Sequence, residues 1–364
     1  MNQGSVLTSI SMRRLAVLLF LVLFAAGCNS GKSSDNPRAT KTTPPPGPVY
    51  CPLTGAETTR DFDLDRPALG VKVENSTASR PQAGLEGADI VYEELAEGGI
   101  TRFLAIYHCS DADPVGPIRS ARLVDPDIML EYQPALLAFS GANAEVKKKV
   151  AETRGITGLR HGDHGDAFYR DKGRKAPSNL FSTTEDLRGL ADLRGRPQTG
   201  LQFQKPGATP PAPNPTQSKP GSPAPPPPAD PGAGATVSFS FSGSSTSKYT
   251  FDAATGSYLR SHGDTPHVNV KGDQLRAVNV VILKVKVTAG TLKDAAGNTS
   301  PEIAVVGEGE AIVVRGGASY TGTWKRPDLQ SKTTITDASG APILMLPGST
   351  WIHLLPQERP VTLG

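Results

Sequence analysis

The chain has 364 residues, with 38 lysines and arginines against 35 aspartates and glutamates, and a formal net charge of +3. This small charge, without a dense run of lysine and arginine, argues against a nucleic-acid partner and against a polybasic membrane surface. Aromatic residues make up 6% of the chain, and proline occurs 33 times. The length suffices for two domains, and the composition excludes one continuous core.

The N-terminal segment is predicted to be a lipoprotein signal peptide, residues 1–27. Arg13 and Arg14 precede an apolar run over 15–26, and small residues lead into Cys28. This pattern predicts export and the attachment of lipid, such as palmitate, to Cys28. The run is shorter than the roughly 20 residues of a transmembrane helix, and a plain secretory signal is the other alternative. We therefore expect a lipid-anchored, extracytoplasmic protein of the cell envelope, at the outer face of the cell membrane.

Cys51 and Cys109 are the two cysteines that remain after Cys28. In an exported protein, an isolated pair favours a disulfide over a metal site or a catalytic nucleophile. Such a long closed loop would add about 4 kcal/mol to the stability. Two buried free thiols are the alternative.

Two polar, proline-rich segments divide the chain. Residues 28–49 are predicted to be a disordered tether between the lipid and the first domain. Residues 204–235, with four successive prolines at 225–228, are predicted to be an extended linker or a loop insertion. The predicted domains are therefore 50–203 and 236–364.

The first domain alternates apolar runs with helical patterns. Helices are predicted over 143–152, with Asn143 as N-cap, and over 125–132, with Pro126 in the first turn. This mixture predicts an α+β or α/β N-terminal domain. The predicted strands are 68–73, 89–93, 102–107 and 135–139.

The second domain is predicted to be β-rich. Short apolar runs separated by turn residues such as Gly316-Gly317 and Pro347-Gly348 are typical of a small antiparallel sheet, a sandwich or a barrel. The predicted strands are 237–241, 278–287, 303–306, 310–314, 333–336 and 350–355.

Several segments of both domains resemble the YerB-type lipoproteins, a bacterial family of unknown function. The resemblance covers nearly all of the chain outside the tether and the proline-rich segment. It implies an N-terminal and a C-terminal domain of that type and an extracytoplasmic location, more than an activity. The segments that carry it are Arg66-Pro67, Arg80-Pro81-Gln82-Ala-Gly-Leu, Ala88-Asp89-Ile-Val-Tyr-Glu93, Glu97-Gly-Gly-Ile-Thr-Arg102-Phe, Gly116-Pro-Ile-Arg119-Ser-Ala-Arg122, Tyr258-Leu-Arg260, Pro266-His267, Asn279-Val-Val, Gly322-Thr-Trp324 and Pro347-Gly-Ser-Thr-Trp351-Ile.

The chain departs from this family in one short motif. Where the family commonly has Ala-Pro-His-Asn, this chain has Ala176-Pro177-Ser178-Asn179. If the histidine of the family motif were a catalytic base, its replacement by Ser178 would weaken an enzymatic interpretation.

Polar residues gather beside the strands of the first domain. Arginine offers a fork of donors that suits phosphate or carboxylate, and acidic oxygens suit a divalent ion. One interpretation is a binding pocket for an anionic ligand or a wall polymer, and the other is a set of ion pairs that pin strands and loops together. The candidate residues are Asp89, Glu93, Glu97, Arg102, Arg119, Ser120 and Arg122.

A looser similarity points to an enzyme. The order of Asp89, the strand 103–107 and Ile118-Arg119 is similar to the LytR-CpsA-Psr wall-polymer transferases. That similarity implies a metal-dependent phosphotransferase that acts on lipid-linked cell-wall precursors, with Asp89 helping to bind magnesium and the arginines holding a pyrophosphate. We favour a non-enzymatic binding protein without a cofactor and leave the enzyme question open.

Other motifs carry less weight. The run His161-Gly-Asp163-His164-Gly-Asp166 has metal-ligand spacing, but glycine and aspartate in such a cluster favour an exposed loop. Trp324 and Trp351 suit core packing better than sugar stacking. We therefore predict no metal site.

Overall fold

Strands β3 (Ala68–Glu74) and β6 (Ala135–Phe139) are buried at every position. Uniform burial is expected of strands in the middle of a sheet that is covered on both faces. The structure, a computed structural model, describes residues 47–205, 234–294 and 297–364. Cys28, the predicted signal peptide and most of the proline-rich segment lie outside the described residues.

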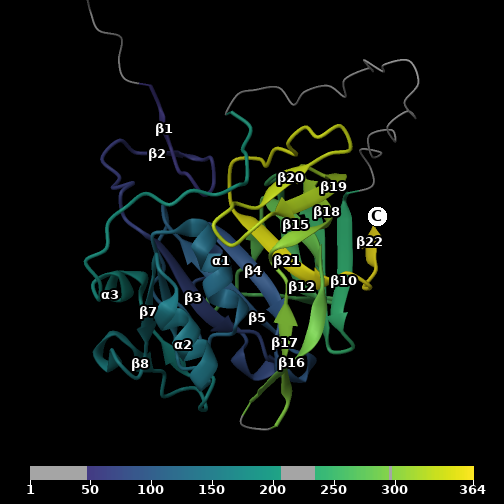
Figure 1. The fold of residues 1–364 in the computed structure, drawn as a ribbon. Coiled ribbons are helices and arrows are strands. Elements are labelled where there is room, and N and C mark those ends of the chain that lie inside the picture. The colour runs from purple at the N-terminus through teal and green to yellow at the C-terminus, as the bar shows by residue number, and fades with distance from the viewer. Residues whose placement is uncertain (1–46, 206–233, 295–296) are drawn as a thin grey trace, which may run out of the picture. The chain divides into compact units, whose positions relative to one another are not determined.

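The central element is a ten-stranded mixed sheet with the order β20-β19-β18-β15-β21-β4-β5-β3-β6-β7 (Figure 1). Its first-half strands, besides β3 and β6, are β4 (Ile90–Leu95), β5 (Thr101–Tyr107) and β7 (Ile156–Arg160). Its second-half strands are β15 (Asn279–Val285), β18 (Gly307–Arg315), β19 (Ala318–Arg326), β20 (Thr334–Thr336) and β21 (Thr350–Pro356).

The two predicted domains are joined within this sheet. β21, near the end of the chain, lies between β15 and β4 and pairs with both in parallel. Thr350 is opposite Ile90 on one side and opposite Asn279 on the other. Backbone hydrogen bonds therefore run without interruption from one half of the chain to the other.

A second sheet of six strands covers one face of the first. Its path is β13-β12-β11-β10-β22, and β14 pairs with β12. Side chains of this sheet, such as Phe239 and Tyr249, share a core with Val91 and Trp351 of the ten-stranded sheet. The bounds are β10 (Thr236–Ser242), β11 (Ser245–Asp252), β12 (Ser257–His262), β13 (Thr265–Pro266), β14 (Arg276–Ala277) and β22 (Val361–Leu363).

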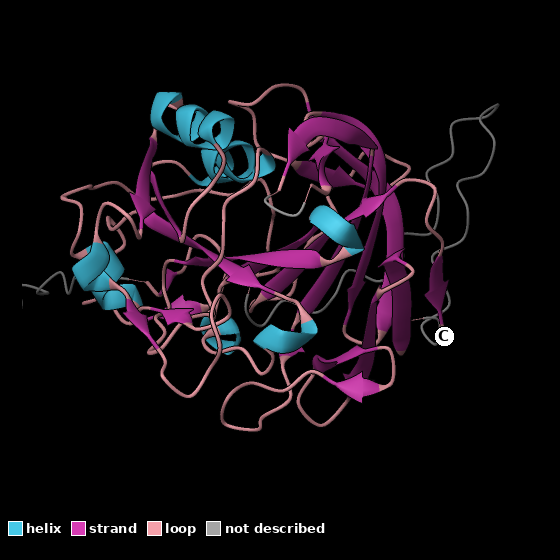
Figure 2. Ribbon diagram, turned by 90° about the horizontal axis from the view of Figure 1, so that it is seen from below, coloured by secondary structure: helices cyan, strands magenta, loops and turns pink. Residues whose placement is uncertain are grey.

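Helices cover part of the other face. Met129 of α1 (Val124–Met129) and Val150 of α2 (Ala144–Glu152) pack against Leu104 and Leu137 of the sheet. In Figure 2 the longest helices lie toward one side of the molecule and strands fill the other. The remaining elements are α3 (Thr184–Arg188), the pairs β1 (Val49–Tyr50) with β2 (Glu57–Thr58), β8 (Tyr169–Arg170) with β9 (Leu180–Phe181) and β16 (Val287–Lys293) with β17 (Thr299–Ile303), and single 3-10 turns at Thr77–Ser79, Leu85–Gly87, Glu97–Gly99, Leu130–Tyr132 and Gly165–Ala167.

Most predicted elements of the first half are present within a few residues. Asn143 caps α2 as expected, because its Oδ1 accepts a hydrogen bond of 2.9 Å from the Val146 amide. The helix predicted from 125 is α1, and it continues as the 3-10 turn Leu130–Tyr132. The first half is thus a sheet with few helices, as the sequence predicts.

The second half is rich in strands, as predicted, but its architecture differs from the expectation. It divides its strands between two sheets instead of forming a small antiparallel sheet, sandwich or barrel of its own. The predicted strand 303–306 is wrong, because Ile303 ends β17 and β18 begins at Gly307. Strands β11, β12 and β19 are absent from the prediction because their polar outward residues hide the alternation.

Cys51 and Cys109 form a disulfide, the pairing expected from the sequence, with their Cα atoms 5.9 Å apart. It ties the segment before β2 to the residues that follow β5. None of the helices in the described ranges is long and apolar enough to cross a membrane.

Candidate functional site

Three strands of the first half end at the same edge of the large sheet. β3 pairs in parallel with β6, and β3 and β4 both run antiparallel to β5. The carboxyl ends of β3, β4 and β6 therefore lie together. Ligands of α/β sheets commonly bind at such an edge.

Arg102, Arg119 and Arg122 reach this edge from two segments. Arg102 lies near the start of β5, directly opposite Glu74 at the end of β3. Arg119 belongs to a segment that extends the pairing of β3, because its amide donates a 2.8 Å hydrogen bond to the Lys72 carbonyl. Arg122 lies just before α1.

The arginines meet two glutamates. The Glu97 carboxylate pairs with Arg122 and lies 3.7 Å from Arg102. The Glu74 carboxylate lies 3.4 Å from Nε of Arg119. We call these five residues, Glu74, Glu97, Arg102, Arg119 and Arg122, the arginine cluster.

Ser120 supports the cluster through its backbone. Its carbonyl oxygen accepts hydrogen bonds from Arg102 (2.9 Å) and Arg122 (3.1 Å). The structure thus brings together four of the residues predicted for the site besides Ser120 itself: Glu97, Arg102, Arg119 and Arg122. Glu74 was not predicted, although a glutamate at the end of an apolar strand marks the edge of a sheet.

Positive charge is in excess in the arginine cluster, since three guanidinium groups face two carboxylates. Burial and the neighbouring Arg122 lower the pKa of Arg102 to about 10. Burial raises the pKa of Glu97, but the charge of Arg122 and the hydrogen bonds from Ser300 and Arg122 together outweigh burial, so the net pKa is lowered. Both residues are therefore ionised at neutral pH.

Arg119 is the most exposed member of the cluster. Its side chain is 24% exposed, against 13% for Arg122 and 6% for Arg102. Among the described residues, its guanidinium pairs only with Glu74, through Nε. The two terminal nitrogens of Arg119 are thus available to a ligand from solvent.

Glu93 does not join this cluster, because its side chain points to the opposite face of the sheet. There it pairs with Arg260 of β12 at 2.9 Å and with His353 of β21 at 3.0 Å. Ser247 and Thr101 also donate hydrogen bonds to it. Burial raises the pKa of Glu93, but Arg260, His353 and Thr101 together outweigh burial and hold that pKa well below its usual value.

Asp89 lies at the other end of β4, before Ile90. Its carboxylate accepts hydrogen bonds from the amides of His108 and Cys109 and from the Ser110 hydroxyl. Burial raises its pKa. Asp89 therefore holds the turn after β5, beside the disulfide, and lies away from the arginines.

A buried ionic triad next to the arginine cluster was missed by the sequence analysis. The Lys72 ammonium bonds to Glu94 and, at 2.7 Å, to Asp125, and all three side chains are fully buried. Burial, followed by the charge of Asp125, raises the pKa of Glu94 to about 8. The amide of Arg122 donates to Asp125 at 2.6 Å, which links the triad to the cluster. The charged Lys72 within the apolar run of β3 is the one feature of the sequence that points to this triad.

Two side chains of the histidine-rich loop have partners close to it in the sequence. Asp163 pairs with Arg160, and His161 contacts the ring of Phe168 edge-on. Within the part of the chain that the structure describes, no three His, Cys, Asp or Glu side chains are placed to hold a metal ion. Trp324 and Trp351 are both buried core residues.

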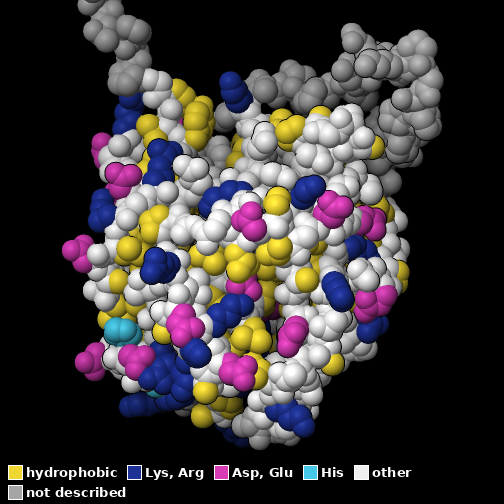
Figure 3. Space-filling model, in the orientation of Figure 1, with side chains coloured by type: hydrophobic (Ala, Val, Ile, Leu, Met, Phe, Trp, Pro, Cys, Tyr) yellow, Lys and Arg dark blue, Asp and Glu magenta, His cyan; other side chains and the backbone are white. Residues whose placement is uncertain are grey.

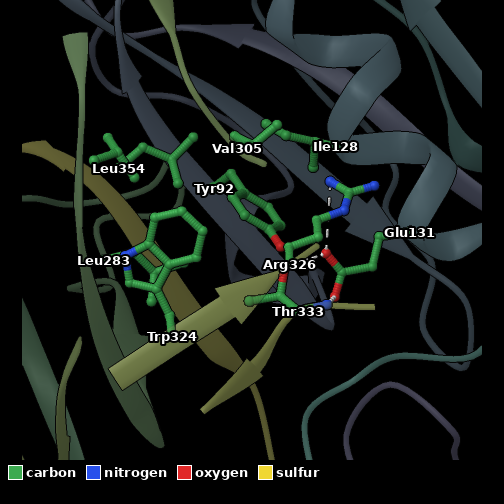
Figure 4. Close-up of a pocket in the computed structure, with 10 residues that line it drawn as sticks. Tyr92, Ile128, Glu131, Leu283, Val305, Trp324, Arg326, Thr333 and Leu354 are labelled. Atoms are coloured by element: carbon green, nitrogen blue, oxygen red, sulfur yellow. Dashed lines mark hydrogen bonds and ion pairs between the residues drawn. The ribbon is translucent and has the colours of Figure 1, made fainter. Parts of the chain in front are cut away.

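Figure 4 shows a narrow cavity on the large sheet, beside α1 and the turn that follows it. Its apolar side includes Leu283 and Trp324, and its polar side is formed by Glu131, Arg326 and Thr333. Thr333 donates to Glu131 through its amide and its hydroxyl, at 3.0 and 2.8 Å. The cavity volume is about 10 Å³, which is room for a single water molecule.

Comparisons with known proteins agree with this architecture. Residues 53–197 match the model described as "Protein of unknown function (DUF3048) N-terminal domain", and residues 236–352 match its C-terminal domain. The "Putative lipoprotein YerB" of Bacillus subtilis (strain 168) is 34% identical over 149 residues, which is 40% of this chain and 44% of that protein. The match thus spans less than half of the relative's length.

The fold also matches a solved structure. The crystal structure of the YerB protein from Bacillus subtilis has a TM-score of 0.70 at 23% sequence identity, over 86% of this chain and 99% of that one. This likeness concerns the fold. Because the two family models follow each other in order and together span most of the residues, the chain belongs to the DUF3048 family, with both its N-terminal and its C-terminal domain.

Proposed function

We propose that this protein is an extracytoplasmic lipoprotein, anchored to the membrane through Cys28, which binds an anionic ligand at the arginine cluster. The two arginines, the apolar run and the small residues that precede Cys28 support a lipid anchor at this residue. The name of the Bacillus subtilis relative, a putative lipoprotein, agrees with it.

One observation carries the ligand site. Three arginines meet two glutamates at the carboxyl edge of the sheet, and the terminal nitrogens of Arg119 face solvent without a partner among the described residues. Guanidinium forks bind phosphate and carboxylate groups through paired hydrogen bonds. The ligand would therefore supply the negative charge that the cluster lacks.

The alternative of a metal-dependent phosphotransferase gains no specific support. It relies on Asp89 acting together with the arginines, whereas Asp89 lies at the opposite end of β4 with three donors on its carboxylate. We therefore propose binding and not catalysis.

Binding is tested by isothermal titration calorimetry, in which the full chain in detergent is titrated with inorganic pyrophosphate and, separately, with citrate. The Arg119→Ala variant is expected to lower the affinity for the preferred anion at least tenfold, because a hydrogen bond to a charged group contributes about 1.5–3 kcal/mol. Arg194→Ala is the matched control, since Arg194 is 61% exposed in a surface pair with Asp63. Equal affinities of the three proteins, or no binding of either anion, would refute the ligand site.

The anchor has a separate test. Metabolic labelling with palmitate should mark the wild-type protein and leave the Cys28→Ala variant unlabelled. The wild-type protein should also sediment with membranes, and the variant should lose its lipid-dependent partition into detergent. Equal labelling of both proteins would refute Cys28 as the lipid-bearing residue.

A further inference from the structure

The hairpin that follows the histidine-rich loop carries exposed positive charge beside the arginine cluster. It consists of β8, β9 and residues 171–179 between them, and we call it the basic hairpin. Tyr169 pairs with Phe181 and Arg170 with Leu180. In Figure 3, lysine and arginine side chains gather at the lower left, on the part of the molecule that carries α2 and β8 in Figure 1.

Three cations of the basic hairpin have no carboxylate partner among the described residues: Arg170, Lys172 and Lys175. All three are exposed. The hairpin's one acidic residue, Asp171, already pairs with Arg174 at 3.5 Å. Arg170 donates to the neutral amide oxygen of Asn179 at 2.7 Å and so keeps its charge uncompensated.

The hairpin is held in a fixed shape. Arg174 donates to the Ser79 carbonyl at 2.9 Å, and its guanidinium lies 5.3 Å from the centre of the Phe181 ring. The Asp171 amide donates to the Asn179 carbonyl at 2.8 Å across the loop. The exposed cations are therefore presented by a braced loop, which lowers the entropy lost on binding.

The hairpin adjoins the arginine cluster through backbone pairing. The amide of Ile118 donates to the Leu180 carbonyl at 2.6 Å, and the next residue is Arg119. Adjacent strands lie about 4.8 Å apart, so β8 is about 10 Å from the segment that carries Arg119. One phosphate cannot span that distance, whereas a chain of them can.

An aromatic surface accompanies the charges. Tyr169 is 47% exposed and stacks on Phe181, with ring centres 6.0 Å apart and planes at 26°. A partly exposed ring backed by a second ring suits contact with a flat or cyclic unit of a ligand. It does not form a wedge of apolar side chains that would enter a membrane.

We infer that the arginine cluster and the basic hairpin form one continuous face for an extended polyanion, a polymer with repeated phosphate or carboxylate groups. The inference rests on the proposed anion site. Arg119 binds one anionic group, and Arg170, Lys172 and Lys175 bind its neighbours along the polymer. The exposed aromatic ring of the hairpin, Tyr169, stacks flat on Phe181, which suits contact with a unit of a polymer better than insertion into a membrane.

The test compares a short and a long probe of the same chemistry on the full chain in detergent. Inorganic pyrophosphate measures the anion site alone, and long-chain inorganic polyphosphate measures the whole face. Wild-type protein should bind polyphosphate at least tenfold more tightly than pyrophosphate, with a steeper dependence on salt because more counterions are released.

The double variant Lys172→Glu/Lys175→Glu should lose this gain and keep the wild-type affinity for pyrophosphate. Lys286→Glu/Lys293→Glu is the control, because it makes the same change of charge at two exposed lysines of the second half. If the hairpin variant binds polyphosphate as wild type does, the inference is overturned and the anion site stands. If Arg119→Ala changes neither affinity, the anion site itself fails.

Vesicles that contain an anionic phospholipid test whether the hairpin binds a membrane instead of a polymer. Wild-type and hairpin-variant proteins, both made as Cys28→Ala to remove the anchor, should bind these vesicles equally weakly. Vesicle binding that depends on Lys172 and Lys175, without a preference for polyphosphate, would assign the hairpin to the membrane and overturn the inference.

Discussion

One nitrogen of Arg260 donates two hydrogen bonds to the carboxylate of Glu93, 3.1 and 2.9 Å long, in the middle of the protein. Glu93 lies on β4 of the large sheet and Arg260 on β12 of the second sheet. Both side chains are buried, and the carboxylate also contacts His353 and accepts hydrogen bonds from Ser247, Thr101 and Asn75. The pair therefore joins the two sheets and also the two halves of the chain.

Removal of the Arg260 side chain should strongly destabilise the fold. Arg260→Met leaves the Glu93 charge buried without its main partner, and the expected loss is about 3–5 kcal/mol of unfolding free energy. Urea denaturation followed by tryptophan fluorescence measures it. The control Lys325→Met breaks the exposed pair with Glu308, 60% and 65% exposed, and should cost less than about 1 kcal/mol. Similar losses in both variants would contradict the prediction.

The disulfide should contribute a large part of the stability. Its cysteines are 58 residues apart, and a cross-link of that length restricts the unfolded chain. Cys51→Ala/Cys109→Ala is expected to lose about 2–5 kcal/mol. Thermal unfolding of the oxidised protein, the reduced protein and the double variant provides the comparison. The reducing agent should lower the melting temperature of the wild type only, and a fall in the variant would point to another cause.

Acid should destabilise the protein through His108. Burial, and after it Arg66 and Arg188, lower the pKa of His108 from 6.5 to about 4. The unfolded chain therefore binds a proton below pH 6.5 that the folded protein refuses until about pH 4, and the stability present above pH 6.5 is lost as the pH falls across this window. Between pH 6.5 and 5 the loss from this residue is about 2 kcal/mol.

The His108→Gln variant checks this assignment. Its free energy of unfolding, measured in urea at several pH values, should fall less steeply below pH 6.5 than that of the wild type. Its dependence between pH 7 and 8 should match the wild type. An unchanged slope below pH 6.5 would show that other groups cause the acid sensitivity.

Alkali should destabilise the protein through Glu94. Its pKa is raised from 4.5 to about 8, by burial and then by Asp125, so the folded protein keeps a proton that the unfolded chain releases. This contribution to stability is complete below pH 4.5 and is lost as the pH rises through about 8. Glu94→Gln imitates the protonated form and should be at least as stable as the wild type at pH 9.

The Lys72→Met variant is the contrasting change in the same triad. It leaves the buried Asp125 carboxylate without its cation and should lose about 3–5 kcal/mol at neutral pH. Urea denaturation at pH 6 and pH 9 separates the two variants. If Glu94→Gln lost as much stability as Lys72→Met at both pH values, the folded protein would need an ionised Glu94, and the prediction of a protonated Glu94 would be wrong.

Most elements of the first half could be predicted because its central strands are largely apolar and its helix α2 begins at a capping asparagine. The sequence could not show that β21 pairs with β4, because strand pairing across more than two hundred residues leaves no local pattern. The polar strands β11 and β12 were missed for the opposite reason. One face of each is solvated, and serine and lysine obscure the alternation.

The candidate site was predicted in part for the same physical reasons. The arginines and Glu97 flank strand ends, which sequence patterns locate, and they meet at one edge of the sheet. Glu93 lies on β4, which leads to Glu97, but its side chain faces the other side of the sheet. Asp89 lies before the opposite end of β4. The basic hairpin was missed because its cations are spaced by other residues and become one surface only when the chain turns at β8 and β9.

The place of β21 also has a consequence for how the chain reaches its native state. This strand begins at Thr350 and lies between β15 and β4, so the middle of the large sheet is filled by a segment synthesised more than two hundred residues after β4. Such distant pairing makes folding slow and leaves β4 and β15 without a shared neighbour until β21 has been synthesised. We therefore expect a truncation before Thr350 to abolish folding of both halves together.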